Sequence, residues 1–228
     1  MAREAIVYVH GLWSSSADSI LLRRRLASAL GCAVWMFRYP SISSSMHEAV
    51  ERLRRFIGER CEPPPEKLHL VGHSLGGLVI YRYLERHADH PPGRIVFIAT
   101  PAVACRAAVG LAHLPLLGPF AGQCVRDELL VERERRWNHT RELGIIAGTR
   151  PLGFGHLIAR LEGENDGTIS VSETRLPGAT DFITLPATHM GLLLSGRVAR
   201  ETALFLRAGH FSLSPRLSTP PVSSARRS

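Results

Sequence analysis

A serine flanked by two glycines has the residue types and spacing to do chemistry. Gly72, Ser74 and Gly76 form a G-x-S-x-G pattern within the segment Leu70–Gly77. The pattern lies directly after an apolar run and directly before a helical segment, which is the context of an exposed nucleophile on a sharp turn. The two glycines are interpreted as structural because they leave room at that turn, and the start of the following helix favours a developing anion. The alternative is that Ser74 only caps the helix.

A second short motif, Val9–Leu12, follows the first apolar run and reads Val-His-Gly-Leu. A His-Gly pair after the strand next to the nucleophile strand, together with the serine motif, resembles the lipase and esterase branch of the α/β hydrolases. The resemblance implies that the backbone N–H groups of Leu12 and Leu75 form an oxyanion hole. His10 and Gly11 are interpreted as structural residues of this loop.

The resemblance also implies that the acid and then the histidine follow the serine along the chain. His189 matches the base, since it lies in the loop after the last expected strand and its ordinary pKa of about 6.5 suits proton transfer at neutral pH. Asp166 matches the acid because its Asn-Asp-Gly segment resembles the one that carries the acid in bacterial lipases, although the segment alone is also typical of an Asx turn. The carboxylates that chain order allows as the acid are Glu162, Glu164, Asp166, Glu173 and Asp181. Glu162 and Glu164 remain minor rivals, and Asp181 is expected to face solvent.

The segments that must position these residues alternate between apolar runs and longer amphipathic stretches, which is typical of a parallel sheet flanked by helices. Strands are expected at 5–9, 33–38, 68–71, 95–99, 143–147 and 182–185. Helices are expected at 17–30, 45–60, 75–87 and 190–206. The predicted fold class is α/β: a doubly wound, mostly parallel sheet of about six strands with helices on both faces, which is the α/β-hydrolase fold.

Two segments depart from this alternation. Residues 101–142 are apolar and rich in glycine and proline at 109–120 and strongly charged at 126–136. They are expected to form a lid-like insertion that covers the site, or alternatively a helical segment that completes the core. Trp13 could line an acyl pocket or pack against this insertion. Residues 1–208 are expected to form one domain and 209–228 a disordered tail, because the tail lacks apolar periodicity.

Charge and cysteine content exclude several other function classes. The formal net charge is +8, but the basic residues are scattered, and Lys67 is the one lysine among 28 basic residues. Nucleic-acid binding is therefore not expected, whereas contact with an anionic lipid surface stays compatible with the arginines. The four cysteines lack the close paired spacing that builds a zinc site, so no metal site is expected. No cofactor is expected.

No apolar stretch reaches the roughly 20 residues that a membrane-spanning helix needs, and no signal peptide is recognised, so a cytoplasmic location is expected. The expected activity is two-step hydrolysis of a small-molecule ester or lipid, with Ser74 as nucleophile, His189 as base and Asp166 as the acid that orients it. A thioesterase, an amidase or an acyltransferase would use the same residues, and a non-catalytic binding protein of the same fold is the alternative from another class. The oligomeric state is left open.

Overall fold

The computed structural model describes residues 4–14, 17–87, 89–114, 121–130, 133–153, 155 and 160–212. Within them the strands form one parallel sheet with the order β2-β1-β3-β4-β5-β6. The strands are β1 (Glu4–Val9), β2 (Ala33–Phe37), β3 (Lys67–His73), β4 (Ile95–Ile98), β5 (Leu143–Gly148) and β6 (Asp181–Leu185). The predicted fold class and the expected number of strands are confirmed.

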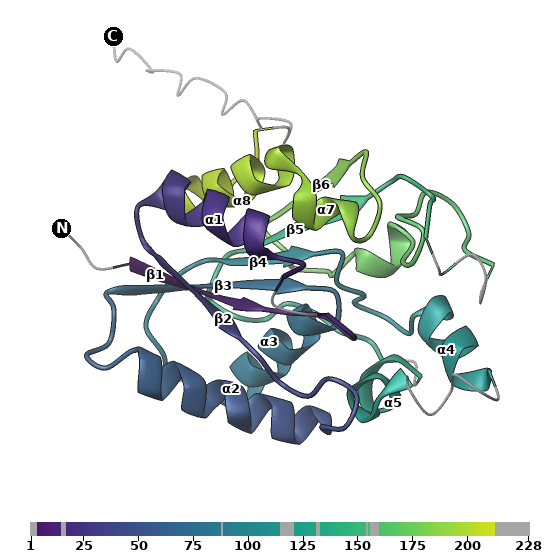
Figure 1. The fold of residues 1–228 in the computed structure, drawn as a ribbon, viewed down its shortest axis with the longest axis horizontal. Coiled ribbons are helices and arrows are strands. Elements are labelled where there is room, and N and C mark those ends of the chain that lie inside the picture. The colour runs from purple at the N-terminus through teal and green to yellow at the C-terminus, as the bar shows by residue number, and fades with distance from the viewer. Residues whose placement is uncertain are drawn as a thin grey trace, which may run out of the picture.

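Helices cover both faces of this sheet (Figure 1). One face carries α1 (Ile20–Leu30), α7 (Gly191–Leu194) and α8 (Gly196–Ala208), and the other carries α2 (Met46–Arg60) and α3 (Leu75–Arg86). None of the described helices is long and apolar enough to cross a membrane.

Alternate side chains along each strand feed two separate cores. In β1, Val7 and Val9 pack toward α2 and α3, whereas Ile6 and Tyr8 pack toward α1 and α8. This alternation follows from the two-residue period of a strand, and burial on both faces explains why the strands read as continuous apolar runs. The loops at the carboxyl edge of the sheet therefore begin from buried strand ends.

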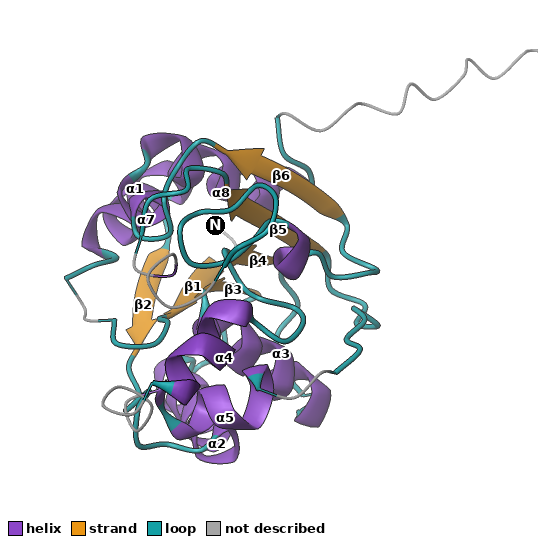
Figure 2. Cartoon of the chain, turned by 90° about the vertical axis from the view of Figure 1, so that its right-hand side faces the viewer, coloured by secondary structure: helices purple, strands orange, loops and turns teal. Residues whose placement is uncertain are grey.

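The described part of 101–142 contains two short helices, α4 (Arg106–His113) and α5 (Gln123–Leu129), and a loop from 133 to 142 that leads to β5. Buried side chains of both helices, among them Leu111, Cys124 and Leu129, belong to the core on the α2 and α3 side. The insertion thus contributes to the core as well as lying beside the carboxyl edge of the sheet (Figure 2). Residues 115–120, part of the apolar stretch interpreted as a lid, lie outside the described residues.

The end of the chain differs from the expectation in two places. The helix expected at 190–206 is two helices, because Ser195 is extended and its hydroxyl caps the second one by accepting a hydrogen bond from the amide of Val198. The disordered tail was expected to start at residue 209, but residues 209–212 belong to the folded part of the chain. Phe211 is buried against Phe205, and the amide of Ser212 donates a hydrogen bond to Glu201. The rest of the expected tail, 213–228, lies outside the described residues.

Acidification should destabilise this fold, because buried His69 on β3 resists protonation. Its Nδ1 accepts a hydrogen bond from the amide of Arg94 at 3.0 Å, and burial lowers its pKa to about 4 although nearby Glu4 acts in the opposite direction. The unfolded chain has a histidine pKa of about 6.5 and binds the proton first, so this contribution to stability is complete above that pH and is lost as the pH falls toward 4. We expect the free energy of unfolding to drop by about 2 kcal/mol from pH 7 to pH 5.

Urea unfolding at both pH values measures this effect. His69→Asn should reduce the difference in stability between pH 7 and pH 5, whereas the exposed His113→Asn should leave it unchanged. An unaltered difference in the His69→Asn protein would contradict the assignment.

Candidate active site

Ser74 occupies a strained turn between β3 and α3, with φ 53° and ψ −128°. Its side chain makes no capping hydrogen bond to the helix, unlike Ser45, whose hydroxyl caps α2 by accepting a hydrogen bond from the amide of Glu48. The capping alternative for Ser74 is therefore wrong. Positive φ is rare for residues other than glycine, and strain of this kind is found at functional positions.

The flanking glycines allow this turn to pack closely against the sheet. A Cβ on Gly76 would lie 2.2 Å from the carbonyl oxygen of Val9, and a Cβ on Gly72 would lie 2.5 Å from the Cα of Gly77. Both positions exclude any side chain, because the atoms that a Cβ would meet are backbone atoms. The backbone of the first turn of α3 is thus in close contact with the backbone at the end of β1.

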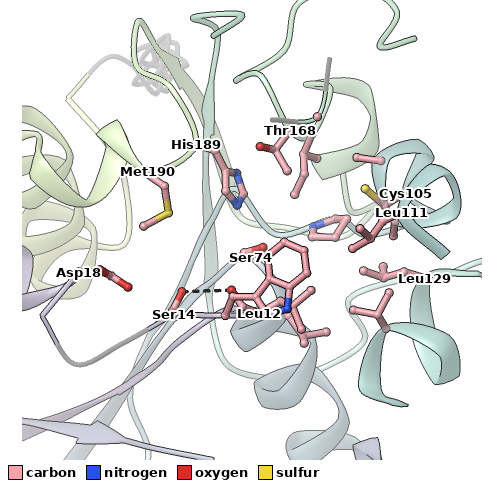
Figure 3. Close-up of a pocket in the computed structure, with 18 residues that line it drawn as sticks. Leu12, Ser14, Asp18, Ser74, Cys105, Leu111, Leu129, Thr168, His189 and Met190 are labelled. Atoms are coloured by element: carbon pink, nitrogen blue, oxygen red, sulfur yellow. Dashed lines mark hydrogen bonds between the residues drawn. The ribbon is translucent and has the colours of Figure 1, made fainter. Parts of the chain in front are cut away.

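Asp166 and His189 form a hydrogen-bonded pair beside Ser74. Their side chains are joined by a hydrogen bond of 2.7 Å between His189 Nδ1 and Asp166 Oδ2. Asp166 is 1% exposed, and its second oxygen accepts hydrogen bonds from the amides of Thr168 at 2.9 Å and Ile169 at 2.8 Å. The carboxylate can only accept at Oδ2, so Nδ1 of the imidazole carries the proton and Nε2 is left as an acceptor. Figure 3 shows the His189 ring pointing toward Ser74.

The loop that carries Asp166 has its own internal hydrogen bonds. Asn165 accepts a hydrogen bond from the amide of Gly167 at 3.0 Å, which is the Asx turn that the sequence also suggested. Gly167 has φ 87°, and a Cβ there would lie 2.3 Å from the carbonyl carbon of Leu152. The two interpretations of the Asn-Asp-Gly segment are compatible, because the turn is what presents the carboxylate to His189.

The rival carboxylates have other surroundings. Glu162 is exposed and pairs with Arg106, and Glu164 is also exposed. Asp181, at the start of β6, accepts hydrogen bonds from the amides of Phe182 and Phe211. Among the carboxylates in the described part of the chain, Asp166 alone forms an ion pair with His189.

The loop after β1 runs directly over the serine turn, since a Cβ on Gly11 would lie 2.9 Å from the Cβ of Ser74. His10 fixes this loop from beneath: its Nε2 accepts a hydrogen bond from the amide of Tyr39 at 3.3 Å, so its Nδ1 donates to the carbonyl of Gly11 at 2.7 Å. Burial lowers the pKa of His10, which favours this neutral form. His10 therefore stabilises the conformation of the loop through the two hydrogen bonds of its ring.

The amides of Leu12 and Leu75 are the two that the sequence predicts to form an oxyanion hole. Leu75 is the first residue of α3, where helical amides lack a partner within the helix. Within the part of the chain that the structure describes, no hydrogen bond engages the amide of Leu12 or of Leu75. The neighbouring amide of Trp13 is already used, because it donates to the hydroxyl of Ser41 at 3.3 Å.

A cavity of about 270 Å³ opens onto Ser74 and is lined mostly by apolar side chains (Figure 3). On one side lie Cys105, Leu111 and Leu129 from the insertion, and on the other Asp18 and Met190. Burial raises the pKa of the Cys105 thiol to about 12, so this cysteine is an apolar wall residue and a poor nucleophile.

Comparisons with known proteins agree with this architecture. A family model described as the alpha/beta hydrolase family matches residues 6–216, which is most of the chain. This chain belongs to the α/β-hydrolase family. A search of curated proteins finds no match to its sequence.

Solved structures similar to this α/β hydrolase include three bacterial or metagenomic enzymes. A mature Bacillus licheniformis lipase is 23% identical with a TM-score of 0.71, covering 90% of this chain and 91% of the lipase. A metagenomic carboxyl esterase is 17% identical with a TM-score of 0.63, covering 83% and 65%. A thioesterase of the prodiginine pathway from Streptomyces coelicolor is 14% identical with a TM-score of 0.58, covering 89% and 84%.

Sequence reasoning missed His73, which lies beside the candidate base of this α/β hydrolase. The centroid of its ring lies 4.8 Å from the centroid of the His189 ring, and its Nε2 donates a hydrogen bond to the carbonyl of His189 at 3.3 Å. Burial lowers the pKa of His73 well below the ordinary value, so the ring stays neutral next to His189. The residue is adjacent to Ser74 in the serine motif, but its contact with residue 189 is a property of the fold that no local pattern reveals.

Glu173, which chain order also makes a candidate for the acid, is bonded to other groups than His189. One of its oxygens accepts hydrogen bonds from the amide and the hydroxyl of Ser170, both at 2.8 Å, and the other accepts from the amide of Arg106 at 2.8 Å. The buried carboxylate thus connects the loop of Asp166 to the start of α4 in this α/β hydrolase. Through these hydrogen bonds, Glu173 joins the loop that carries Asp166 to the helix that lines one side of the cavity.

Proposed function

We propose that this chain is a serine hydrolase that cleaves carboxylic esters through an acyl-enzyme intermediate. The observation that carries the proposal is the strained Ser74 at the floor of an apolar cavity, with the hydrogen-bonded pair of His189 and Asp166 beside it. Membership of the α/β-hydrolase family and the likeness to lipase and esterase structures support it.

In the first step the Ser74 hydroxyl attacks the ester carbonyl while Nε2 of His189 takes its proton. Asp166 accepts from Nδ1 in this step and stabilises the imidazolium that forms, without taking up the proton. Since both oxygens of Asp166 are held by hydrogen bonds, the imidazole is fixed in the one tautomer that can accept from the serine.

The negative charge that develops on the carbonyl oxygen would be stabilised by the amides of Leu12 and Leu75. The second amide lies at the N-terminus of α3, where the helix dipole adds favourable potential. Losing one such donor typically raises the barrier by about 3 kcal/mol. His189 then returns its proton to the departing alcohol. In the second step water attacks the acyl-enzyme while His189 takes its proton, and the proton is then returned to the oxygen of Ser74 as the acid is released.

The acyl group would enter the apolar side of the cavity, away from His189. That side is lined by Ala108 and Leu111 of α4, by Val125 and Leu129 of α5, and by Cys105. The alcohol would leave on the side of the base, past Met190 and Asp18. Aliphatic acyl chains are the substrates that such a wall favours, because each buried methylene contributes about 0.8 kcal/mol.

A series of p-nitrophenyl esters from acetate to palmitate tests the proposal, together with the matching acyl thioesters. Wild-type protein should hydrolyse the esters in a Ser74-dependent manner. Ala108→Phe should fill the apolar side and lower kcat/KM for long chains relative to acetate by about tenfold, the equivalent of roughly two excluded methylenes.

His113→Phe provides the matched control, because this residue is exposed on the same helix and does not line the cavity. Its chain-length profile should equal that of the wild type. Equal profiles for Ala108→Phe and the wild type would place the acyl group elsewhere, and Ser74-dependent cleavage of thioesters alone would replace the proposed activity by that of a thioesterase.

A further inference from the structure

Among the residues that the structure describes, the large exposed apolar side chains all follow the carboxyl ends of strands. After the carboxyl end of β1 come Trp13, Ile20 and Leu21, the last two in the first turn of α1. Ile42 follows the carboxyl end of β2, and Val103 follows that of β4. Exposed residues of this kind are normally scattered singly over a protein surface.

The remaining three exposed residues of this class in the described part of the chain complete the pattern. Leu152 follows the carboxyl end of β5, and Met190 and Leu194 follow that of β6, the second with 55% of its surface exposed. The strands are parallel, so their carboxyl ends lie at one edge of the sheet, the edge that faces the viewer in Figure 2. We call these eight side chains, from Trp13 to Leu194, the apolar edge.

The apolar edge includes residues at the cavity that contains Ser74. Trp13, which is 48% exposed, and Met190 both line that cavity. Val103 lies between the cavity residues Pro101 and Cys105. A molecule that covers the apolar edge would therefore meet the entrance through which an acyl chain must pass.

Positive charge accompanies the apolar edge. Arg38 directly follows β2 and Arg150 follows β5; both are exposed, and neither is in an ion pair with another described residue. Arg25 of α1 donates to the carbonyl of Leu194 at 2.6 Å, which places this arginine beside an apolar residue of the edge. Among the carboxylates nearby, Glu162 is paired with Arg106, while Asp18 and Glu164 oppose the positive charge.

We propose that the apolar edge docks this protein onto a lipid bilayer that contains anionic phospholipid. Apolar side chains inserted at the boundary of headgroups and acyl chains, flanked by arginines near anionic headgroups, are the two contributions that hold a protein on such a surface. The formal net charge of +8 adds long-range attraction. This proposal rests on the proposed function, because docking would bring lipid to the cavity at Ser74. Membrane binding itself requires no turnover and can be measured separately.

Flotation with lipid vesicles tests the proposal, using the full chain with Ser74→Ala in every protein so that no lipid is hydrolysed. The parent should bind vesicles of phosphatidylcholine and phosphatidylglycerol in equal parts at least about tenfold more strongly than phosphatidylcholine alone. The triple variant Leu21→Gln, Ile42→Gln and Leu194→Gln, none of which lines the cavity, should bind about tenfold more weakly. The single variant Leu194→Gln should show part of this loss and serves if the triple variant does not fold.

Charge is tested by Arg38→Gln with Arg150→Gln, which should weaken binding to the mixed vesicles by about tenfold. The matched control replaces two exposed arginines of α2, Arg52 and Arg55, by glutamine and should change binding less than twofold. The proposal is overturned if the parent does not bind the mixed vesicles or if the apolar variants bind as the parent does. It is also overturned if the parent forms a dimer that the apolar variants abolish, since the apolar edge would then bind a second copy of this chain.

Discussion

Ester hydrolysis by the Ser74→Ala variant should fall by about 10⁶-fold in kcat relative to the wild type. Removing the hydroxyl removes the atom that forms the acyl-enzyme, while the strained turn and the cavity are expected to persist because alanine is no larger than serine. Initial rates on a p-nitrophenyl ester under saturating substrate measure the effect, with the melting temperature as the check on folding.

Ser14→Ala is the matched control, because Ser14 lines the same cavity and its hydroxyl bonds to the carbonyl of Leu12. This variant should keep kcat within a few-fold. Groups that act as one unit give non-additive losses, so Ser74→Ala combined with Asp166→Asn should be no slower than Ser74→Ala alone. A Ser74→Ala protein with substantial remaining activity would mean that another residue attacks the ester.

Asp166→Asn should lower kcat by about 10⁴-fold without loss of structure. The amides of Thr168 and Ile169 both donate to one oxygen of Asp166, so an asparagine would keep its carbonyl oxygen there and turn its NH₂ group toward His189. That donor would face Nδ1 and force the imidazole proton onto Nε2, where it opposes the serine proton. The same ester assay, together with thermal unfolding, measures both halves of the prediction.

The neighbouring carboxylates supply controls of the same chemistry. Glu162→Gln and Glu164→Gln should keep kcat within a few-fold, since both side chains are exposed and neither is bonded to His189. If Asp166→Asn retained near wild-type activity, or if one of the two glutamates proved more sensitive, the acid would have been assigned wrongly.

The strands and most helices could be predicted because each depends on local pattern. Leu68 and Val71 lie in a strand that is buried on both faces, and Ser45 with Glu48 carries the sequence of a capping box that starts α2. The break at Ser195 was missed because the apolar spacing continues across it, while the capping hydrogen bond that starts α8 is made three residues later. Phe211 was assigned to the tail because its partner Phe205 lies before a stretch that has no periodicity.

The part of the candidate site that lies in short sequence motifs could be predicted from the sequence. Ser74 and the loop of His10 have patterns of their own, whereas Asp166 and His189 were named from chain order and resemblance, and the structure brings their side chains to hydrogen-bonding distance. The contacts of Tyr39 with His10 and of His73 with His189 join residues far apart in the sequence, so no local pattern predicts them. The apolar edge is a property of strand direction and emerges only when the loops are placed together.

The proposed function depends above all on the reactivity of Ser74, which a fluorophosphonate tests without any assumption about the substrate. Such a reagent phosphonylates a serine only where the hydroxyl is activated and an oxyanion hole receives the developing charge. The intact protein should gain the mass of one label, the labelled peptide should contain Ser74, and both His189→Ala and Ser74→Ala should lose the labelling. A folded wild-type protein that takes up no label, or that is labelled at another serine, would rule out Ser74 as the nucleophile.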